Sequence, residues 1–190
     1  RSTLFPYTTL FRSASVVEFC VEHNIPIKVL TKNAKSPYAP YMGILFEKIR
    51  NLGADVYFGF TLTGRDDMER LASSNDERVE AMKFLKEQGM KTFASIEPVI
   101  DWESSMNIIK KALPYCDHFK IGLRSGVKKD YYDDSEIIHS ISWLKHVILG
   151  EGKTLYFKES IRKRACGIMG DNWLTSFLKG TLDMDGNLIS

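Results

Sequence analysis

NDERVEAMKFLKEQGMKTFASIEPVI, residues Asn75–Ile100, joins a helix pattern to a strand pattern. Ser74 just before it and Glu77 have the spacing of a capping box, which predicts a helix over Asn75–Gln88. A glycine follows directly, as is typical of a helix end. The next run, Lys91–Ile96, is short and rich in strand-forming residues, so it predicts a strand. This stretch is one helix–strand unit, and the fold can be predicted from how often the unit recurs.

The same alternation occurs along most of the chain. Strands recur after roughly 26–36 residues, which suits β-α crossover units. Repeated units of this kind predict an α/β fold with about five parallel strands and outer helices. The predicted strands are Ile27–Thr31, Val56–Thr63, Lys91–Ile96, His118–Leu123 and Leu155–Lys158. The other predicted helices are Val16–His23, Tyr41–Leu52, a helix from an Asp101 cap to Leu113, Glu136–Leu149 and Ser160–Cys166.

Residues 1–13, RSTLFPYTTLFRS, resemble the translation of a sequencing adapter. We expect this segment to be non-native, so it is left out of the fold prediction. The rest is expected to be a fragment that lacks its native N-terminus. It divides into a partial barrel over residues 14–166 and an irregular extension over 167–190, with one short helix near Trp173–Leu178.

Composition narrows the class of protein only broadly. The chain is 44% hydrophobic and 26% charged, as is ordinary for a globular domain, and its net charge of +2 indicates no particular polyanionic partner. No apolar run approaches the ~20 residues that span a bilayer, so no membrane partner is expected. Cys20, Cys116 and Cys166 stand far apart without metal-ligand spacing. Free thiols are typical of a reducing compartment, and we expect a cytoplasmic location.

Alternation divides each predicted strand into an apolar face and a polar face. A strand buried between two helix layers would be apolar on both faces, so the polar face of this sheet needs another explanation. Its polar groups gather at the carboxyl ends of the strands, where α/β barrels place their active sites. They are Lys32, Thr61, Thr63, Glu97, Lys120 and Lys158.

Two interpretations of these polar groups are open. Burying several charges is costly unless they are paired or wetted, which favours a water-filled functional lumen. The alternative is a network of internal pairs, for example Glu97 with Lys120. Pro98 restricts Glu97 to extended backbone angles and is expected to end the strand there.

Five motifs in order resemble one known family. They are VLTKNA at Val29–Ala34, GFTLTG at Gly59–Gly64, the stretch Asn75–Ile100, HFKIGL at His118–Leu123 and YFKES at Tyr156–Ser160. Together they cover roughly Val16–Cys166. The chain resembles the radical S-adenosylmethionine (radical SAM) family, in the branch related to spore photoproduct lyase and similar phage-borne proteins.

The resemblance implies the C-terminal part of a (β/α)₆ partial barrel of the TIM type. It also implies a [4Fe–4S] cluster that cleaves S-adenosylmethionine to a 5′-deoxyadenosyl radical, and an external electron donor such as flavodoxin or ferredoxin. Three thiolates at C-x₃-C-x₂-C spacing would hold that cluster. This sequence has neither that motif nor the family's Gly-Gly-Glu turn, so the fragment itself is expected to be inactive. The substrate, a small molecule or a nucleic acid, is left open.

The resemblance also suggests roles for individual residues. Thr61 and Thr63 correspond to positions that contact the adenosine ribose. Ser95 and Glu97 lie on the strand that usually borders the adenine and the methionine. Lys32, Lys120 and Lys158 are candidates for binding an acidic group of the substrate.

Two other functions are compatible with the sequence. A Schiff-base lyase on the same barrel would use Lys120 or Lys158 as nucleophile, with Glu97 as the acid. A nucleic-acid contact would use a basic run close to two aromatic residues. That run comprises Lys158, Arg162, Lys163 and Arg164, next to Tyr156 and Phe157.

Overall fold

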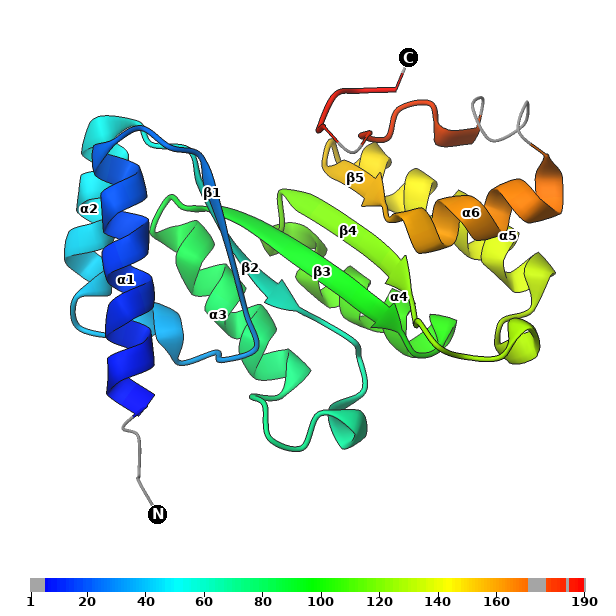
Figure 1. The fold of residues 1–190 in the computed structure, drawn as a ribbon, viewed down its shortest axis with the longest axis horizontal. Coiled ribbons are helices and arrows are strands. Elements are labelled where there is room, and N and C mark those ends of the chain that lie inside the picture. Colours follow the sequence, from blue (N-terminus) through cyan, green and yellow to red (C-terminus); the bar gives the residue numbers. More distant parts are fainter. Residues whose placement is uncertain (1–5, 171–176, 184, 190) are drawn as a thin grey trace.

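Five parallel strands lie side by side in one sheet of the computed structural model, in the order β1-β2-β3-β4-β5 (Figure 1). The structure describes residues 6–170, 177–183 and 185–189. The strands are β1 (Ile27–Thr31), β2 (Val56–Thr61), β3 (Lys91–Val99), β4 (His118–Leu123) and β5 (Thr154–Phe157). The helices are α1 (Pro6–Glu22), α2 (Met42–Leu52), α3 (Asn75–Glu87), α4 (Trp102–Ala112), α5 (Asp134–Leu144) and α6 (Glu159–Met169).

The predicted α/β class with five parallel strands is confirmed. Neighbours in the sheet are also neighbours in the sequence, and α2, α3, α4 and α5 connect them in turn. Right-handed crossovers between adjacent parallel strands place all these helices on one face. Consecutive strands with helices on a single face form the wall of a partial α/β barrel. None of the helices among the described residues is long and apolar enough to cross a membrane.

The core lies between the helices and the apolar face predicted from strand alternation. Phe60 of β2, Ile96 of β3 and Phe119 of β4 are each at most 1% exposed. The alternate residues of the strands point to the opposite face. There Leu30 of β1 remains half-exposed and Lys120 of β4 is only partly buried. The sheet therefore has one dry face and one polar face.

Local signals placed several element boundaries correctly. β1 and β4 have the predicted bounds, and Ser74 caps α3 in a full capping box with Glu77. Asp101 caps α4 by accepting a hydrogen bond from the backbone N–H of Ser104. Gly53 ends α2 with a positive φ of 61°, a conformation that glycine adopts without steric cost.

The prediction that Pro98 ends β3 is wrong, because this strand continues to Val99. The register with β4 shifts between Ile96 and Val99. Proline has no N–H to give to a strand ladder, and an irregularity of this kind is where a strand tolerates it.

Other boundaries move by a few residues. α5 begins at Asp134 because Asp133 accepts hydrogen bonds from two backbone N–H groups, and the helix continues as a π-helical turn over Lys145–Leu149. β2 ends earlier than predicted, at Thr61, and β5 begins at Thr154. α1 extends back through part of the adapter-like segment, and α6 continues past residue 166 to Met169.

The C-terminal extension is partly ordered against the sheet. Leu182 forms a parallel bridge with Tyr156 and an antiparallel bridge with Leu188. Its backbone N–H donates to the carbonyl of Leu155 at 2.8 Å. The extension therefore covers part of the β5 edge. The helix predicted near Trp173–Leu178 falls mostly on residues 171–176, which lie outside the described residues.

Gly59 makes room for an aromatic ring on the polar face. A Cβ atom at Gly59 would lie 2.3 Å from Cε1 of Phe93, its partner in the β2–β3 register. Phe93 is 2% exposed, so the ring occupies the space above the glycine.

We predict that Gly59→Ala destabilises the protein by about 1–3 kcal/mol, because the added methyl overlaps the buried ring of Phe93. Gly43→Ala is the matched control. Gly43 lies in α2 with nothing within 4 Å of the added Cβ, so this change should be neutral or stabilising by up to about 1 kcal/mol. Urea denaturation of the three proteins measures both effects. Equal stabilities for the Gly59 variant and the native chain would contradict the packing described.

Candidate functional site

Strand register brings four side chains into one row across the polar face. Thr61 pairs with Ser95, Ser95 with Lys120, and Lys120 with Tyr156. Residues in direct register on parallel strands point to the same face of the sheet. Thr61 and Ser95 are 7% and 3% exposed, while Lys120 is partly exposed. Three of the residues predicted from the sequence therefore lie next to one another.

An ion pair lies one step closer to the carboxyl edge. Glu97 of β3 and Lys158, directly after β5, form a salt bridge, and each side chain is about one-third exposed. Between them lies Gly122 of β4, where a Cβ atom would be 3.0 Å from both Glu97 Oε1 and Lys158 Cδ. Glu97 is thus paired internally, as in the alternative interpretation of the polar groups, but its partner is Lys158 and not the Lys120 given there as an example. The missing side chain at Gly122 lets the two longer side chains meet across β4.

Lys120 contacts an aromatic face. Its Nζ lies 5.3 Å from the ring centroid of Phe93, and no described carboxylate forms an ion pair with it. Burial lowers the pKa of Lys120, and the cations Lys28 and Lys158 lower it further, while Glu97 acts in the opposite direction. The ammonium form is thus less favoured here than on an ordinary surface lysine.

Thr63 and Lys32 belong to a separate cluster around Glu69. The Thr63 hydroxyl donates to Glu69 Oε2 at 2.9 Å, and Lys32 Nζ lies 2.7 Å from Oε1. Arg78 Nη1 lies 2.8 Å from Oε2 and also donates to the carbonyl of Thr61 at 2.6 Å. Arg78 is fully buried, and the Glu69 side chain is 8% exposed.

Sequence reasoning missed Glu69 and Arg78. Glu69 follows a short 3-10 turn in a segment without periodicity, so no pattern marks it. Arg78 did carry a signal. It lies four residues before Met82 and seven before Leu85, and so on the apolar stripe of α3. A charged residue on a buried stripe predicts a buried partner.

The Glu69 carboxylate is held in its charged form. Burial by itself would raise its pKa, but Lys32, Arg78 and Thr63 together outweigh burial and lower it. Both the hydroxyl of Thr63 and the ammonium of Lys32 are thereby engaged in an internal network that ties the end of β1 to β2 and α3.

The basic run is largely paired within the chain. Lys158 bonds Glu97, Lys163 lies 2.9 Å from Glu159, and Arg164 bonds Asp134. Intramolecular pairing reduces the charge that this run can offer to a phosphate backbone. The structure thus gives little support to a nucleic-acid contact at this helix.

The cysteines do not fit an iron–sulfur cluster. Within the described residues, no group of three Cys, His, Asp or Glu side chains could hold a metal ion. Cys116 is fully buried and donates to the carbonyl of His118 at 3.1 Å, and burial raises the pKa of its thiol. Cys20 and Cys166 lie on α1 and α6.

Two histidines lie in different surroundings. His139 of α5 is exposed. His118 of β4 is buried, with its Nδ1 2.9 Å from Thr154 Oγ1. Burial, with help from Lys28 and Lys120, lowers the pKa of His118 to about 4, so it is neutral at pH 7.

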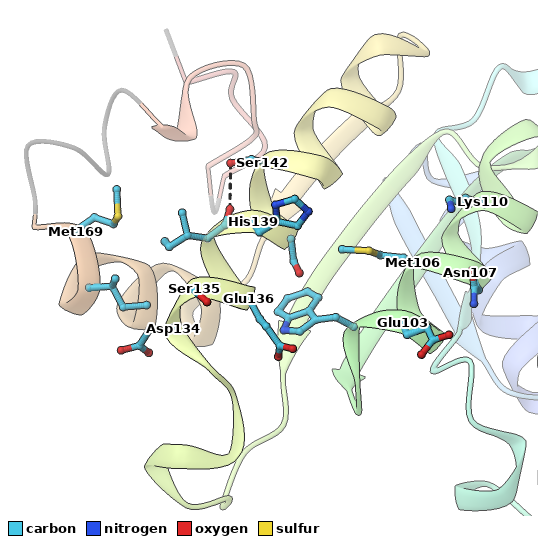
Figure 2. Close-up of a pocket in the computed structure, with 14 residues that line it drawn as sticks. Glu103, Met106, Asn107, Lys110, Asp134, Ser135, Glu136, His139, Ser142 and Met169 are labelled. Carbon is cyan, nitrogen blue, oxygen red and sulfur yellow. Dashed lines mark hydrogen bonds between the residues drawn. The ribbon is translucent and has the colours of Figure 1, made fainter.

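A wide hollow of about 1170 Å³ lies away from the polar face, between α4, α5 and α6 (Figure 2). Met106 of α4 and His139 of α5 point toward one another across it, with Glu103 and Glu136 nearby. None of the site residues predicted from the sequence lines it. The chemistry-bearing groups lie instead on the opposite face of the sheet.

We predict that Glu69→Gln lowers the free energy of unfolding at pH 7 by roughly 3–5 kcal/mol, because it leaves the charge of Arg78 buried without a counterion. A carboxyl group with a lowered pKa in the folded state stabilises it above the unfolded pKa of about 4.3, and this stabilisation is lost as pH falls through the folded pKa. The difference in the free energy of unfolding between the native chain and the variant should therefore shrink below about pH 4. Urea denaturation from pH 7 to pH 3 measures this difference, and a difference independent of pH would contradict the charged network. Asp76→Asn, at an exposed ion pair with Lys111, is the control and should change stability by less than about 1 kcal/mol.

No protein-family model matches this sequence, and no curated protein matches it. Among solved structures, the chain is similar to the crystal structure of SuiB from Streptococcus suis. The two share 12% sequence identity over 86% of this chain and 46% of SuiB, with a TM-score of 0.47. The chain thus spans less than half the length of SuiB, and at this level of similarity the match says nothing about what the chain binds.

Proposed function

We propose that the polar face binds the nucleoside part of S-adenosylmethionine, and that the chain is part of a cytoplasmic radical SAM enzyme. The observation that carries the proposal is the row Thr61–Ser95–Lys120 with Glu97 beside it. The row supplies hydroxyl and ammonium groups from the end of β2 and the middle of β3 and β4, and Glu97 adds a carboxylate nearer the carboxyl ends of the strands. α/β barrels bind their ligands at this end of the strands.

The groups in this row match the polar atoms of the ligand. Hydroxyl groups both donate and accept hydrogen bonds, so Thr61 and Ser95 can bind the ribose hydroxyls. Glu97 can accept from the same hydroxyls, since a carboxylate has free lone pairs beyond those that Lys158 uses. Lys120 can neutralise the carboxylate of the methionine part. Thr63 is not part of this proposal, because its hydroxyl bonds Glu69.

The described residues do not account for the iron–sulfur cluster of a radical SAM enzyme. When bound in a radical SAM enzyme, such a cluster supplies the electron that cleaves S-adenosylmethionine. The cysteines of the described residues do not fit it. In this proposal the cluster, and the site for an electron donor such as flavodoxin or ferredoxin, belong to other parts of the enzyme. The substrate class stays open between small molecules and nucleic acids.

We predict that the chain binds S-adenosylmethionine saturably and that Thr61→Val and Ser95→Ala each weaken binding about 3- to 10-fold, the loss of one hydrogen bond. Isothermal titration calorimetry measures the affinities. Ser142→Ala is the control, because Ser142 lies on α5 and donates to the carbonyl of Ile138 away from the polar face. Absence of saturable binding, or equal weakening in the control, would overturn the proposal.

A further inference from the structure

Lys120 is partly buried and has no counterion among the described residues, whereas Lys28 on the same face also lacks one but is exposed. Lys32 pairs with Glu69, Lys91 with Asp55 and Lys158 with Glu97. Lys120 is more buried than an ordinary surface lysine, yet its contact is the face of the Phe93 ring. A partly buried amine without a carboxylate partner is poorly stabilised as a cation.

Burial disfavours the ammonium form of Lys120. The nearby cations Lys28 of β1 and Lys158, directly after β5, disfavour it further. Glu97 from β3 is the opposing group, but its carboxylate bonds Lys158. His118 from the same strand is neutral at pH 7. An amine that is desolvated and lies close to other cations is the environment that activates lysine as a nucleophile.

The structure also distinguishes the two lysines that the sequence left open. Lys158 is engaged by Glu97, whereas Lys120 lies between hydroxyl-bearing neighbours, Ser95 on one side and Tyr156 on the other. These hydroxyls can hydrogen-bond an oxygen on the carbon that an amine attacks. Lys28 and Lys158 add positive charge for an acidic group on the same ligand.

We propose that Lys120 forms a Schiff base with a small carbonyl compound that carries a carboxylate, such as an α-keto or aldehydic acid. The neutral amine adds to the carbonyl carbon to give a carbinolamine. The carbonyl oxygen then leaves as water with both hydrogens of the amine, and a C=N bond replaces the C=O bond. The step requires no oxidant or reductant. It does not require the proposed binding of S-adenosylmethionine, which would compete for the same lysine.

Reductive trapping tests this site on the whole chain. The protein is treated with glyoxylate and cyanoborohydride at pH 7, and modification at each lysine is followed by peptide mass spectrometry. We expect Lys120 to be modified at least tenfold faster than Lys110. Lys110 is the matched lysine, because its Nζ also lies over an aromatic ring, 5.5 Å from Trp143, but on the outer helices. Equal rates at the two positions would overturn the proposal.

Two variants separate an electrostatic effect from a structural one. Lys158→Met and Glu97→Gln both break the same salt bridge. Lys158→Met removes a cation that lowers the pKa of Lys120, so trapping at pH 7 should slow. Glu97→Gln removes the group that raises this pKa, so trapping should become faster. Changes in the same direction for both variants would contradict the assigned environment.

A second aldehyde tests whether the ligand must carry an acidic group. Propanal, which has no acidic group, should trap on Lys120 more slowly than glyoxylate relative to Lys110. If propanal and glyoxylate show the same preference for Lys120, the carboxylate part of the proposal fails. Titration with S-adenosylmethionine in the same preparations shows whether the nucleoside proposal stands or fails separately.

Discussion

Right-handed crossovers between adjacent parallel strands place every connecting helix on one face of this sheet, and the rest of the structure depends on that constraint. The face toward the helices takes the large apolar side chains, including Phe60 and Phe119, which are at most 1% exposed. The opposite face is thereby free to carry charged and hydroxyl groups. Every second residue of a strand points to the same face, and neighbouring strands are in register, so these groups form rows across the sheet. The rows determine which groups can interact.

Small residues then decide the partners within the rows. Gly122 has no side chain, so Glu97 and Lys158 meet across β4. Gly59 accommodates the ring of Phe93, and that ring in turn lies beneath the Lys120 ammonium. Near the end of β2, the buried charge of Arg78 is compensated by Glu69 and by the carbonyl of Thr61. Most charges of the polar face are thus satisfied internally, and Lys120 is a partly buried lysine of this face that has no counterion among the described residues.

Patterns that are local in sequence predicted much of this fold. The capping box of Ser74 and Glu77 and the alternation in β1 and β4 depend on residues a few positions apart, and they placed these elements correctly. The site was predictable only in part. Alternation predicts that Ser95 and Lys120 share a face, but the partner of Glu97 depends on a glycine in a neighbouring strand. Glu69 lies in an aperiodic segment, and its role depends on Arg78, which comes from a different element.

The two proposals for the polar face make different demands on the chain. Binding a nucleoside needs hydroxyl groups in register, which Thr61 and Ser95 provide. Radical chemistry also needs an iron–sulfur cluster, and the described cysteines do not fit one. Amine chemistry at Lys120 needs only a desolvated lysine, nearby cations and hydroxyl groups, all of which this chain supplies. Both ligands would use the Ser95–Lys120 pair, so the two cannot occupy the row at once. A carboxylate bound near Lys120 would restore the counterion that this lysine lacks, and would raise its pKa. Occupancy by S-adenosylmethionine should therefore suppress the nucleophilicity of the amine, which makes the charge state of Lys120 the link between the two.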